Sequence, residues 1–267
     1  MKLVIILLVC FFSSATGSIC GIGGGVIIKP ALDASGILDA ASASFLSGCT
    51  VLAMSAISLY KNLRNTKAAA FDQTFASVLT SGSVIGGILG KSAFQYILQH
   101  PTAKSRAAAI QSAILLLLTA GTLAYELHKE KITPKHIQSQ SAVFCIGCLL
   151  GILSAFLGIG GGPVNLIVLF YFFSMQTKEA ALYSIYIILF SQTASLLVTI
   201  LAGTVPDFSA ALLFLMTSCG VLGGLAGSAV SRRIDSKTVD RLFSGLMLVI
   251  ILISLSNIFR YYGSSFS

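Results

Sequence analysis

The feature that most constrains this chain is an uncharged run of 41 residues, Ile137–Thr177, with a cluster of glycines near its middle. As one α-helix this run would be roughly 60 Å long, about twice the thickness of a bilayer's hydrocarbon core. The glycines of the sequence GIGGG at Gly158–Gly162 disfavour a continuous helix, because each Gly costs about 1 kcal/mol relative to Ala in a helix interior. Pro163 follows them and suits the first position of a new helix. The run therefore predicts a broken segment whose second helix starts at Pro163 and faces the glycines with its N-terminus.

The composition of the chain is that of a membrane protein. Hydrophobic residues make up 55% of it and charged residues 10%, with a mean hydropathy of +0.92, whereas a soluble domain has roughly 25% charged residues. The formal charge of +8 does not indicate nucleic acid, because Lys and Arg fall in small groups between apolar runs. We therefore expect an all-α, multi-pass integral protein of the cell membrane, in contact with the lipid bilayer and without a nucleic-acid partner.

The sequence GIGGG occurs a second time at Gly21–Gly25, 137 residues before its other copy. At the same spacing, Ser81–Gly90 agrees with Ser218–Gly227 at five of ten positions. Two matches at one spacing indicate an internal repeat. It predicts two homologous halves, residues 1–130 and 135–267, that together form one transmembrane domain. The N-terminal apolar run imitates a secretory signal, but its counterpart lies in mid-chain, so we expect it to be retained.

Each half has one Gly-broken segment followed by three apolar runs, each about as long as a spanning helix. The broken segments are Leu3–Leu32 and Ser139–Ser174. The apolar runs are Ala40–Tyr60, Phe71–Leu98, Ala107–Tyr125, Ala180–Ala202, Phe208–Ser231 and Leu242–Phe259.

The distribution of Lys and Arg distinguishes two ways of crossing the membrane. If both broken segments span it, the two sides carry 8 and 9 of these residues, which gives no orientation. If each broken segment enters and leaves on one side, the count becomes 11 against 6, and the richer side is cytoplasmic by the positive-inside rule. The sequence therefore predicts two inverted repeats, each a re-entrant helical hairpin plus three transmembrane helices, with both termini outside. The richer side holds Lys61, Arg64, Lys67, Lys129, Lys131, Lys135, Lys178, Arg232, Arg233, Lys237 and Arg241, and the poorer side holds Lys2, Lys29, Lys91, Lys104, Arg106 and Arg260.

The two glycine loops are the candidate binding site. Non-helical backbone at membrane depth is tolerated only inside protein or beside a watery cavity, so two such loops from inverted halves would meet near the midplane. There they would present unpaired N–H groups and the positive ends of two half-helices, which suit an anion. Close helix packing is the alternative role for clustered glycines, and it is the role we expect for Gly86, Gly87, Gly90, Gly223, Gly224 and Gly227. The predicted anion site comprises Gly21, Gly23, Gly24, Gly25, Gly158, Gly160, Gly161 and Gly162.

Several polar side chains inside or beside apolar runs extend this prediction. Lys29 and Lys91 could attract an anion, since ionisable residues at such depth are often functional, or they could snorkel to the interface. Asn165 follows the start of the second half-helix by two residues and could contact the ligand. Gln111 and Gln192 are also polar residues inside apolar runs. For all three amides, the alternative to contact with the ligand is a hydrogen bond between helices. Further candidates near the loops are Ser44, Ser184 and Cys20.

The two motifs that open the halves, GIGGGVIIKPAL at Gly21–Leu32 and GIGGGPVN at Gly158–Asn165, resemble those of the TauE/SafE sulfite exporter family. The resemblance covers nearly the whole chain. It implies a permease for small sulfur-containing anions such as sulfite, thiosulfate or sulfonates, driven by ion gradients and without a nucleotide-binding subunit. The halves differ in one respect: Pro30 has Ile167 as its counterpart, while Pro163 directly follows the second glycine run. The second half-helix is therefore expected to start differently.

Other classes of function find less support in the sequence. We expect neither an enzyme nor a cofactor or metal, since no nucleophile and base pair, paired-carboxylate site, metal-ligand spacing or phosphate loop can be assembled. A membrane scaffold or signalling subunit with the same fold stays the alternative, although it has no need for two helix breaks at the midplane. A cation carrier is disfavoured because Asp72, Glu179 and Asp207 lie near the ends of apolar runs. The sequence leaves open the anion, the direction of transport, the oligomeric state, including a homo-oligomer, and the coupling ion, for which a proton is the candidate.

Overall fold

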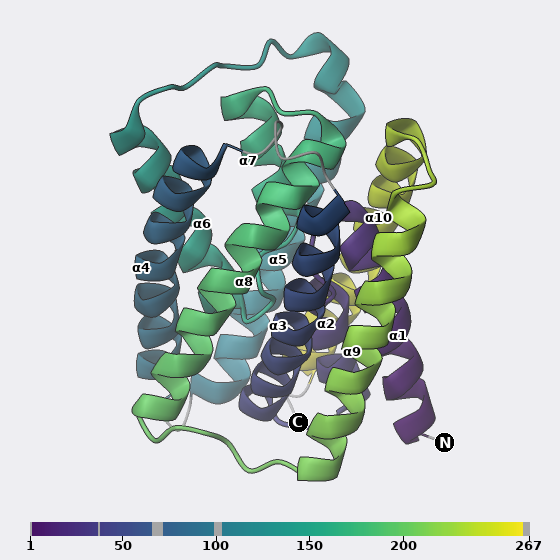
Figure 1. The fold of residues 1–267 in the computed structure, drawn as a ribbon. Helices are drawn as coiled ribbons and strands as arrows, with labels where there is room; N and C mark the ends of the chain where they lie inside the picture. Colours follow the sequence, from purple (N-terminus) through teal and green to yellow (C-terminus); the bar gives the residue numbers. More distant parts are fainter. Residues whose placement is uncertain (1, 37, 66–71, 99–102, 264–267) are drawn as a thin grey trace.

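The structure is a computed structural model that describes residues 2–36, 38–65, 72–98 and 103–263, and these form a bundle of ten α-helices without a strand (Figure 1). In chain order the helices are α1 (Lys2–Cys20), α2 (Gly25–Ser35), α3 (Ala40–Asn65), α4 (Gln73–Leu98), α5 (Ala103–His128), α6 (Gln140–Leu157), α7 (Pro163–Phe173), α8 (Thr177–Leu201), α9 (Ala210–Ser231) and α10 (Ser236–Gly263), with a short 3-10 turn, η2 (Lys129–Lys131), after α5. In the described part of the chain, seven of them, α1, α3, α5, α6, α8, α9 and α10, are long and apolar enough to cross a membrane. The protein is therefore an all-helical, multi-pass membrane protein, as the sequence predicts.

The predicted apolar runs all correspond to helices, and four of these, α3, α5, α8 and α10, extend beyond the run into polar residues. For example, α10 begins at Ser236, six residues before the predicted Leu242. Hydrophobicity marks only the part of a helix that lies in lipid, whereas hydrogen bonding continues the helix into water. The predicted starting residue of the second run, Phe71, lies outside the described residues. α4 is 26 residues long but is not among these seven, because several Ser, Thr and Gly residues and Lys91 interrupt its apolar stretch.

Both Gly-broken segments are hairpins that return to the end of the bundle where they begin. In the first, Ile6 and Cys10 near the start of α1 pack with Ile28 and Leu32 of α2 in one apolar cluster. In the second, the N–H of Ile137 before α6 donates to the carbonyl oxygen of Phe172 at the end of α7, at 3.0 Å. Each half thus opens with a helical hairpin, which is consistent with the predicted re-entrant segments.

Helices of the first half pack against helices of the second in matched pairs. α4 packs on α6 as α9 packs on α1, and α3 lies beside α9 as α8 lies beside α4. Glycines permit this close approach: a Cβ at Gly86 would lie only 2.0 Å from the carbonyl oxygen of Cys148, and one at Gly223 only 2.5 Å from that of Phe11. The predicted packing role of these glycines is confirmed. The exchange of partners between halves is what two inverted repeats would produce.

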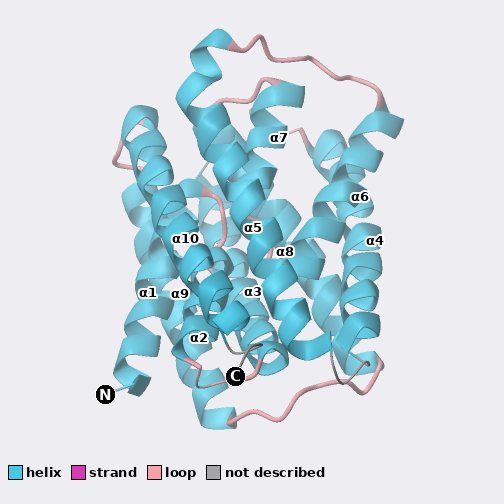
Figure 2. Cartoon of the chain, turned by 180° about the vertical axis from the view of Figure 1, so that it is seen from behind, coloured by secondary structure: helices cyan, strands magenta, loops and turns pink. Residues whose placement is uncertain are grey.

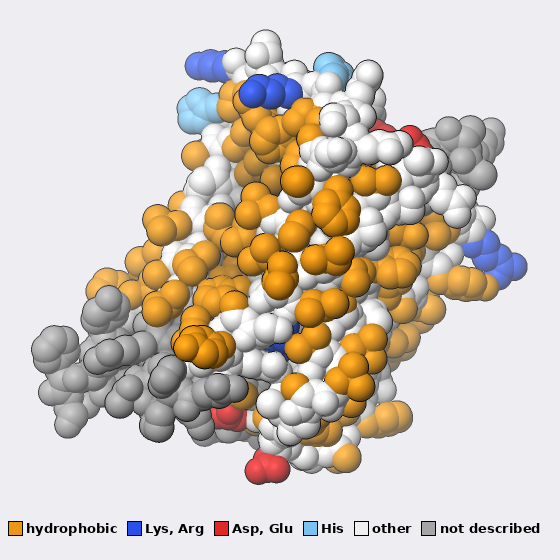
Figure 3. Space-filling view, turned by 90° about the vertical axis from the view of Figure 1, so that its left-hand side faces the viewer, with side chains coloured by type: hydrophobic (Ala, Val, Ile, Leu, Met, Phe, Trp, Pro, Cys, Tyr) orange, Lys and Arg blue, Asp and Glu red, His pale blue; other side chains and the backbone are white. Residues whose placement is uncertain are grey.

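The two ends of the bundle differ in the segments that they carry. Both termini lie at one end, together with the connection between α8 and α9, while residues 129–139 and the connection between α9 and α10 lie at the other (Figures 1 and 2). We call these the terminal end and the opposite end. Hydrophobic side chains cover the middle of the face in Figure 3, and Lys, Arg and His gather mostly towards its upper end. Lys67 of the charge count lies outside the described residues, as do the side chains of Lys2, Lys104, Arg106 and Arg260.

An ion-pair network ties the opposite end together. Lys129 after α5 lies 2.6 Å from a carboxylate oxygen of Glu126 and 2.6 Å from one of Asp240 on α10. Burial disfavours the charged form of Lys129, but its hydrogen bonds to Asp240 and Glu126 outweigh this and raise its pKa above the ordinary value. Thr177 on α8 also donates to Asp240, at 2.8 Å. Three helices from both halves are therefore joined at this end.

Candidate functional site

The two glycine loops contact each other inside the bundle. All ten residues of the two GIGGG sequences are buried. A Cβ at Gly25 would lie 2.4 Å from the carbonyl oxygen of Ile159, and one at Gly23 would lie 3.7 Å from that of Gly160. Irregular backbone is thus enclosed in protein from both halves, which is the condition for its stability at membrane depth.

Identical sequences give the loops different shapes because different residues follow them. Pro163 excludes the preceding residue from the α region, and Gly162 accordingly has φ 116° and ψ −159°. In the first loop Val26 imposes no such restriction, and Gly24 has φ −65° in the right-handed region. α2 therefore begins at Gly25, whereas α7 begins one position later, at Pro163. This is the difference between the halves that the sequence predicts.

Both loops present backbone donors without acceptors. Among the described residues, no hydrogen bond is formed by the N–H groups of Gly23, Gly24, Gly25 and Val26, or by those of Ile159, Gly160, Gly161, Gly162 and Val164. Most buried N–H groups in proteins are paired, so two clusters of unpaired donors at the starts of α2 and α7 are unusual. Helix starts with free N–H groups favour an anion, through the donors and through the partial positive charge of the helix dipole.

A symmetric pair of side chains covers the loops. Val51 on α3 and Ile188 on α8 are 137 positions apart, the spacing of the repeat. Val51 would contact a Cβ at Gly25 at 2.8 Å and one at Gly160 at 2.7 Å, and Ile188 would contact a Cβ at Gly23 at 3.2 Å. The loops are therefore enclosed by one aliphatic side chain from each half.

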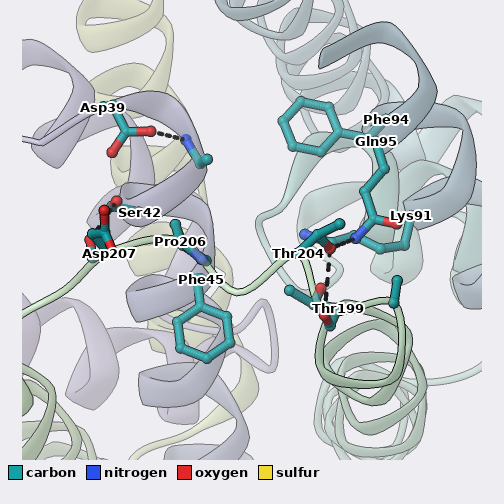
Figure 4. A pocket seen from close by; sticks show the side chains of 12 residues that line it. Asp39, Ser42, Phe45, Lys91, Phe94, Gln95, Thr199, Thr204, Pro206 and Asp207 are labelled. Atoms are coloured by element: carbon teal, nitrogen blue, oxygen red, sulfur yellow. Dashed lines mark hydrogen bonds between the residues drawn. The ribbon is translucent and has the colours of Figure 1, made fainter. Parts of the chain in front are cut away.

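Two open cavities lie at opposite ends of the bundle. The terminal vestibule, of about 590 Å³, is lined by α3, α4 and the segment after α8, and Figure 4 shows Lys91, Phe94 and Asp207 among its side chains. The opposite vestibule, of about 660 Å³, includes Lys178, Arg232 and Ala181 in its lining. Ala181 abuts the first loop, since a Cβ at Gly21 would lie 2.5 Å from the Cβ of Ala181.

Lys29, a candidate from the sequence, lies beside the second loop and is paired with a carboxylate. Its side chain is 3% exposed, and its Cε would lie 3.3 Å from a Cβ at Gly158. Its Nζ lies 2.9 Å from Oδ2 of Asp33 and donates to Oε1 of Gln111 at 2.9 Å. Lys29 therefore does not snorkel to the interface.

Lys91 lies on α4, in the lining of the terminal vestibule. It is 6% exposed and forms no ion pair with any residue that the structure describes. Its Nζ lies 5.4 Å from the ring centroid of Phe94, a distance at which the aromatic face attracts a cation. It is a buried cation at the base of an open cavity.

The amide side chains divide into those that bridge helices and those that face the loops. Gln111 accepts from Lys29 and donates to the carbonyl oxygen of Phe156 at 2.6 Å, so the predicted role between helices is confirmed. Asn165 is buried and donates to Ser184 at 3.4 Å, a long hydrogen bond. Gln192 is 3% exposed, its Cγ would lie 3.4 Å from a Cβ at Gly160, and its Oε1 has no hydrogen-bond partner.

The sequence analysis missed Asp33. It is 7% exposed and forms its ion pair from within the short helix α2. The carboxylates predicted to be nearest the membrane lie at the ends of long apolar runs, whereas Asp33 follows directly after Leu32, at the end of the broken segment. The signal was present in the sequence, since Lys29 and Asp33 are four positions apart and share one face of a helix.

Two helix breaks enclosed in the bundle, with a cavity at each end, are typical of multi-pass membrane transporters. A comparison with protein families gives the finer assignment: the model described as "Sulfite exporter TauE/SafE" matches residues 6–254. The chain belongs to this family. No curated protein and no solved structure matches it.

Proposed function

We propose that this protein is a secondary transporter of a small sulfur-containing oxyanion or sulfonate, such as sulfite or thiosulfate, and that the anion binds between the two glycine loops. The observation that carries the proposal is the pair of donor clusters at the starts of α2 and α7, buried together and without protein acceptors. A desolvated oxyanion needs several donors in place of water. Two helix starts supply them, together with about half a positive charge each.

The positions of the vestibules support transport rather than simple binding. One cavity opens at each end, and Val51 and Ile188 lie between them around the loops. In alternating access, one repeat rocks against the other around a fixed central site. The exchange of helix partners between residues 1–130 and 135–267 is compatible with such motion. A scaffold or signalling subunit would have no use for this arrangement.

Flux into reconstituted vesicles tests the proposal. We expect sulfite, thiosulfate or methanesulfonate to enter at least about tenfold faster than dimethyl sulfone, a neutral isostere of methanesulfonate, since a tenfold preference corresponds to about 1.4 kcal/mol. Vesicles without protein give the background. Equal flux of anion and isostere, or preference for a cation, would contradict an anion site. If no solute exceeded the background, the scaffold alternative would be favoured.

The distribution of Lys and Arg supports an orientation with the opposite end in the cytoplasm of a cell-membrane protein. Single cysteines introduced at Asn62, in the opposite vestibule, and at Thr204, in the terminal vestibule, test it in intact cells. An impermeant thiol reagent is expected to label Thr204→Cys alone from outside. Labelling of both positions from outside would contradict the orientation.

A further inference from the structure

The ion pair of α2 is the feature that anion binding alone does not explain. Lys29 and Asp33 have side chains only 4% exposed each and lie 2.9 Å apart. A buried ion pair is expensive to desolvate and often adds little stability compared with apolar residues of the same size. The counterparts of Lys29 and Asp33 in the second half are in fact Leu166 and Phe170, which are buried and apolar. The same helical position is thus compatible with an apolar pair, which suggests that the charged pair has a function.

The position of Lys29 relates the pair to the proposed anion site. Its Cε lies beside Gly158, at the start of the second loop, and its Nζ donates to Gln111 on α5. Gln111 in turn donates to the carbonyl oxygen of Phe156, two residues before that loop. Lys29 can therefore turn from Asp33 towards an anion at the unpaired N–H groups of the second loop by rotating its side chain, without movement of α2.

We propose that Asp33 is the site of the coupling proton, so that one proton crosses with each anion. This inference rests on the proposed function. In the empty site, the ammonium of Lys29 pairs with the carboxylate of Asp33. When an anion binds, the ammonium pairs with the anion instead, and a proton from the solution adds to a carboxylate oxygen of Asp33 to give the neutral acid. On release of the anion, Asp33 returns its proton to the solution on the other side, and the ion pair forms again.

Charge balance is the reason for the coupling. A neutral ion pair in the empty site becomes, with a monoanion bound, another neutral ion pair and a neutral acid. Without the proton, the loaded site would hold one unpaired negative charge in a medium of low dielectric constant, which is strongly unfavourable. Binding of the anion and of the proton therefore favour each other, and this reciprocal linkage is the requirement for coupled transport.

The groups around α2 leave Asp33 as the carboxylate available for this role. α10 contributes Asn257, which donates to the carbonyl oxygen of Pro30 at 3.0 Å and does not titrate. α1 contributes the thiol of Cys10, in an apolar cluster with Ile28. In the described residues of α4, Lys91 is the only charged side chain, and α3 contributes the thiol of Cys49.

The test compares Asp33→Asn with the wild type in vesicles under an imposed pH gradient. We expect an inward proton gradient to accelerate uptake of the transported anion by the wild type, and this acceleration to be lost in Asp33→Asn. Uptake of the anion down its own concentration gradient is expected to remain measurable in the variant. The net charge that crosses with each anion should become more negative by one elementary charge, because the proton no longer accompanies it. Any proton that the anion itself carries, as hydrogensulfite does, is common to both proteins and cancels in the comparison. The matched control is Glu126→Gln, a buried carboxylate that also pairs with a lysine but lies at the opposite end, and its coupling is expected to equal that of the wild type.

The outcomes separate this inference from the proposed function. Absence of anion flux in the wild type would contradict the proposed function itself. Wild-type flux with unchanged coupling in Asp33→Asn would overturn the role of Asp33 alone. If Asp33→Asn does not fold because Lys29 is left buried and unpaired, the double variant Lys29→Gln/Asp33→Asn removes both charges. It is also expected to lose the response to the pH gradient, and a retained response in the folded double variant would overturn the inference.

Discussion

The two glycine loops share one pentapeptide and yet differ in shape and in chemistry. The first turns into α2 through Gly24 in the right-handed region, and four residues after Gly25 it places the cation of Lys29. The second has φ values of 117° and 116° at Gly161 and Gly162, and its helix offers the neutral amide of Asn165. A duplicated backbone motif has thus been combined with two different sets of side chains. We infer that the backbone supplies donors from both halves, while charge compensation belongs to the first half.

The largest effect is expected from bulk in the second loop. At Gly160, with φ +74°, a Cβ would already lie 2.7 Å from Val51, and the left-handed backbone adds roughly 1–2 kcal/mol for a side chain. Gly160→Leu should therefore abolish anion flux. Gly23→Leu should reduce flux less, because the nearest atom to its Cβ is the end of the Ile188 side chain at 3.2 Å. Flux and thermal unfolding in detergent measure both variants.

A packing glycine provides the control for this pair. Gly87 lies in the helix contact between α4 and α8, where its Cβ would lie 3.0 Å from the carbonyl oxygen of Ser191. Gly87→Leu should lower stability by about 1–3 kcal/mol through overpacking, with flux per folded molecule largely kept. Normal transport by folded Gly160→Leu would refute the role of the loops in binding the anion. The difference in shape between the two loops would then matter only for folding.

A smaller effect is expected from Asn165→Leu. The residue of the first half that corresponds to Asn165 is Ile28, so this change gives both half-helices an apolar side chain at the same position. Hydrogen bonds to charged groups contribute about 1.5–3 kcal/mol, so loss of one to the anion should lower flux at limiting substrate by about 10–100-fold. Ser184→Ala removes only the acceptor of the long bond from Asn165 and should change flux little. If both variants lowered stability equally and left flux unchanged, Asn165 would serve only to join α7 and α8.

The fold was largely predictable because its determinants are local in the sequence. Consecutive glycines break helices, Pro163 starts one, and apolar runs of spanning length form the others. The charge count could predict hairpins rather than extra spans because Lys and Arg remain at the ends where they are soluble. The contact between the two loops followed from the duplicated motif, since irregular backbone in a membrane has to be buried in protein.

The chemistry of the site was less predictable because it depends on contacts distant in sequence. Lys29 is joined to Gln111, and Gln111 to Phe156, through separations of 82 and 45 positions that no local pattern encodes. Val51 and Ile188 are ordinary aliphatic residues within apolar helices, and only the packed structure places them over the loops. The repeat spacing relates these two positions to each other, but it does not show that they touch the glycines.

The smallest effect is expected from Lys91→Gln, which separates long-range attraction from direct binding. Lys91 lines the terminal vestibule and pairs with no described carboxylate, so it attracts anions that enter from that end, although Asp39 and Asp207 of the same lining offset part of its charge. Its loss should lower initial rates from the terminal side about two- to fivefold at low ionic strength, with a smaller deficit as salt screens the charge. Lys178→Gln, in the opposite vestibule, is the matched variant, and it should have an effect of similar size on entry from the other side, because Glu179 of the same lining offsets part of its charge. A deficit of Lys91→Gln that was independent of salt would indicate direct contact with the anion, and Lys29 would then not be the only cation at the binding site.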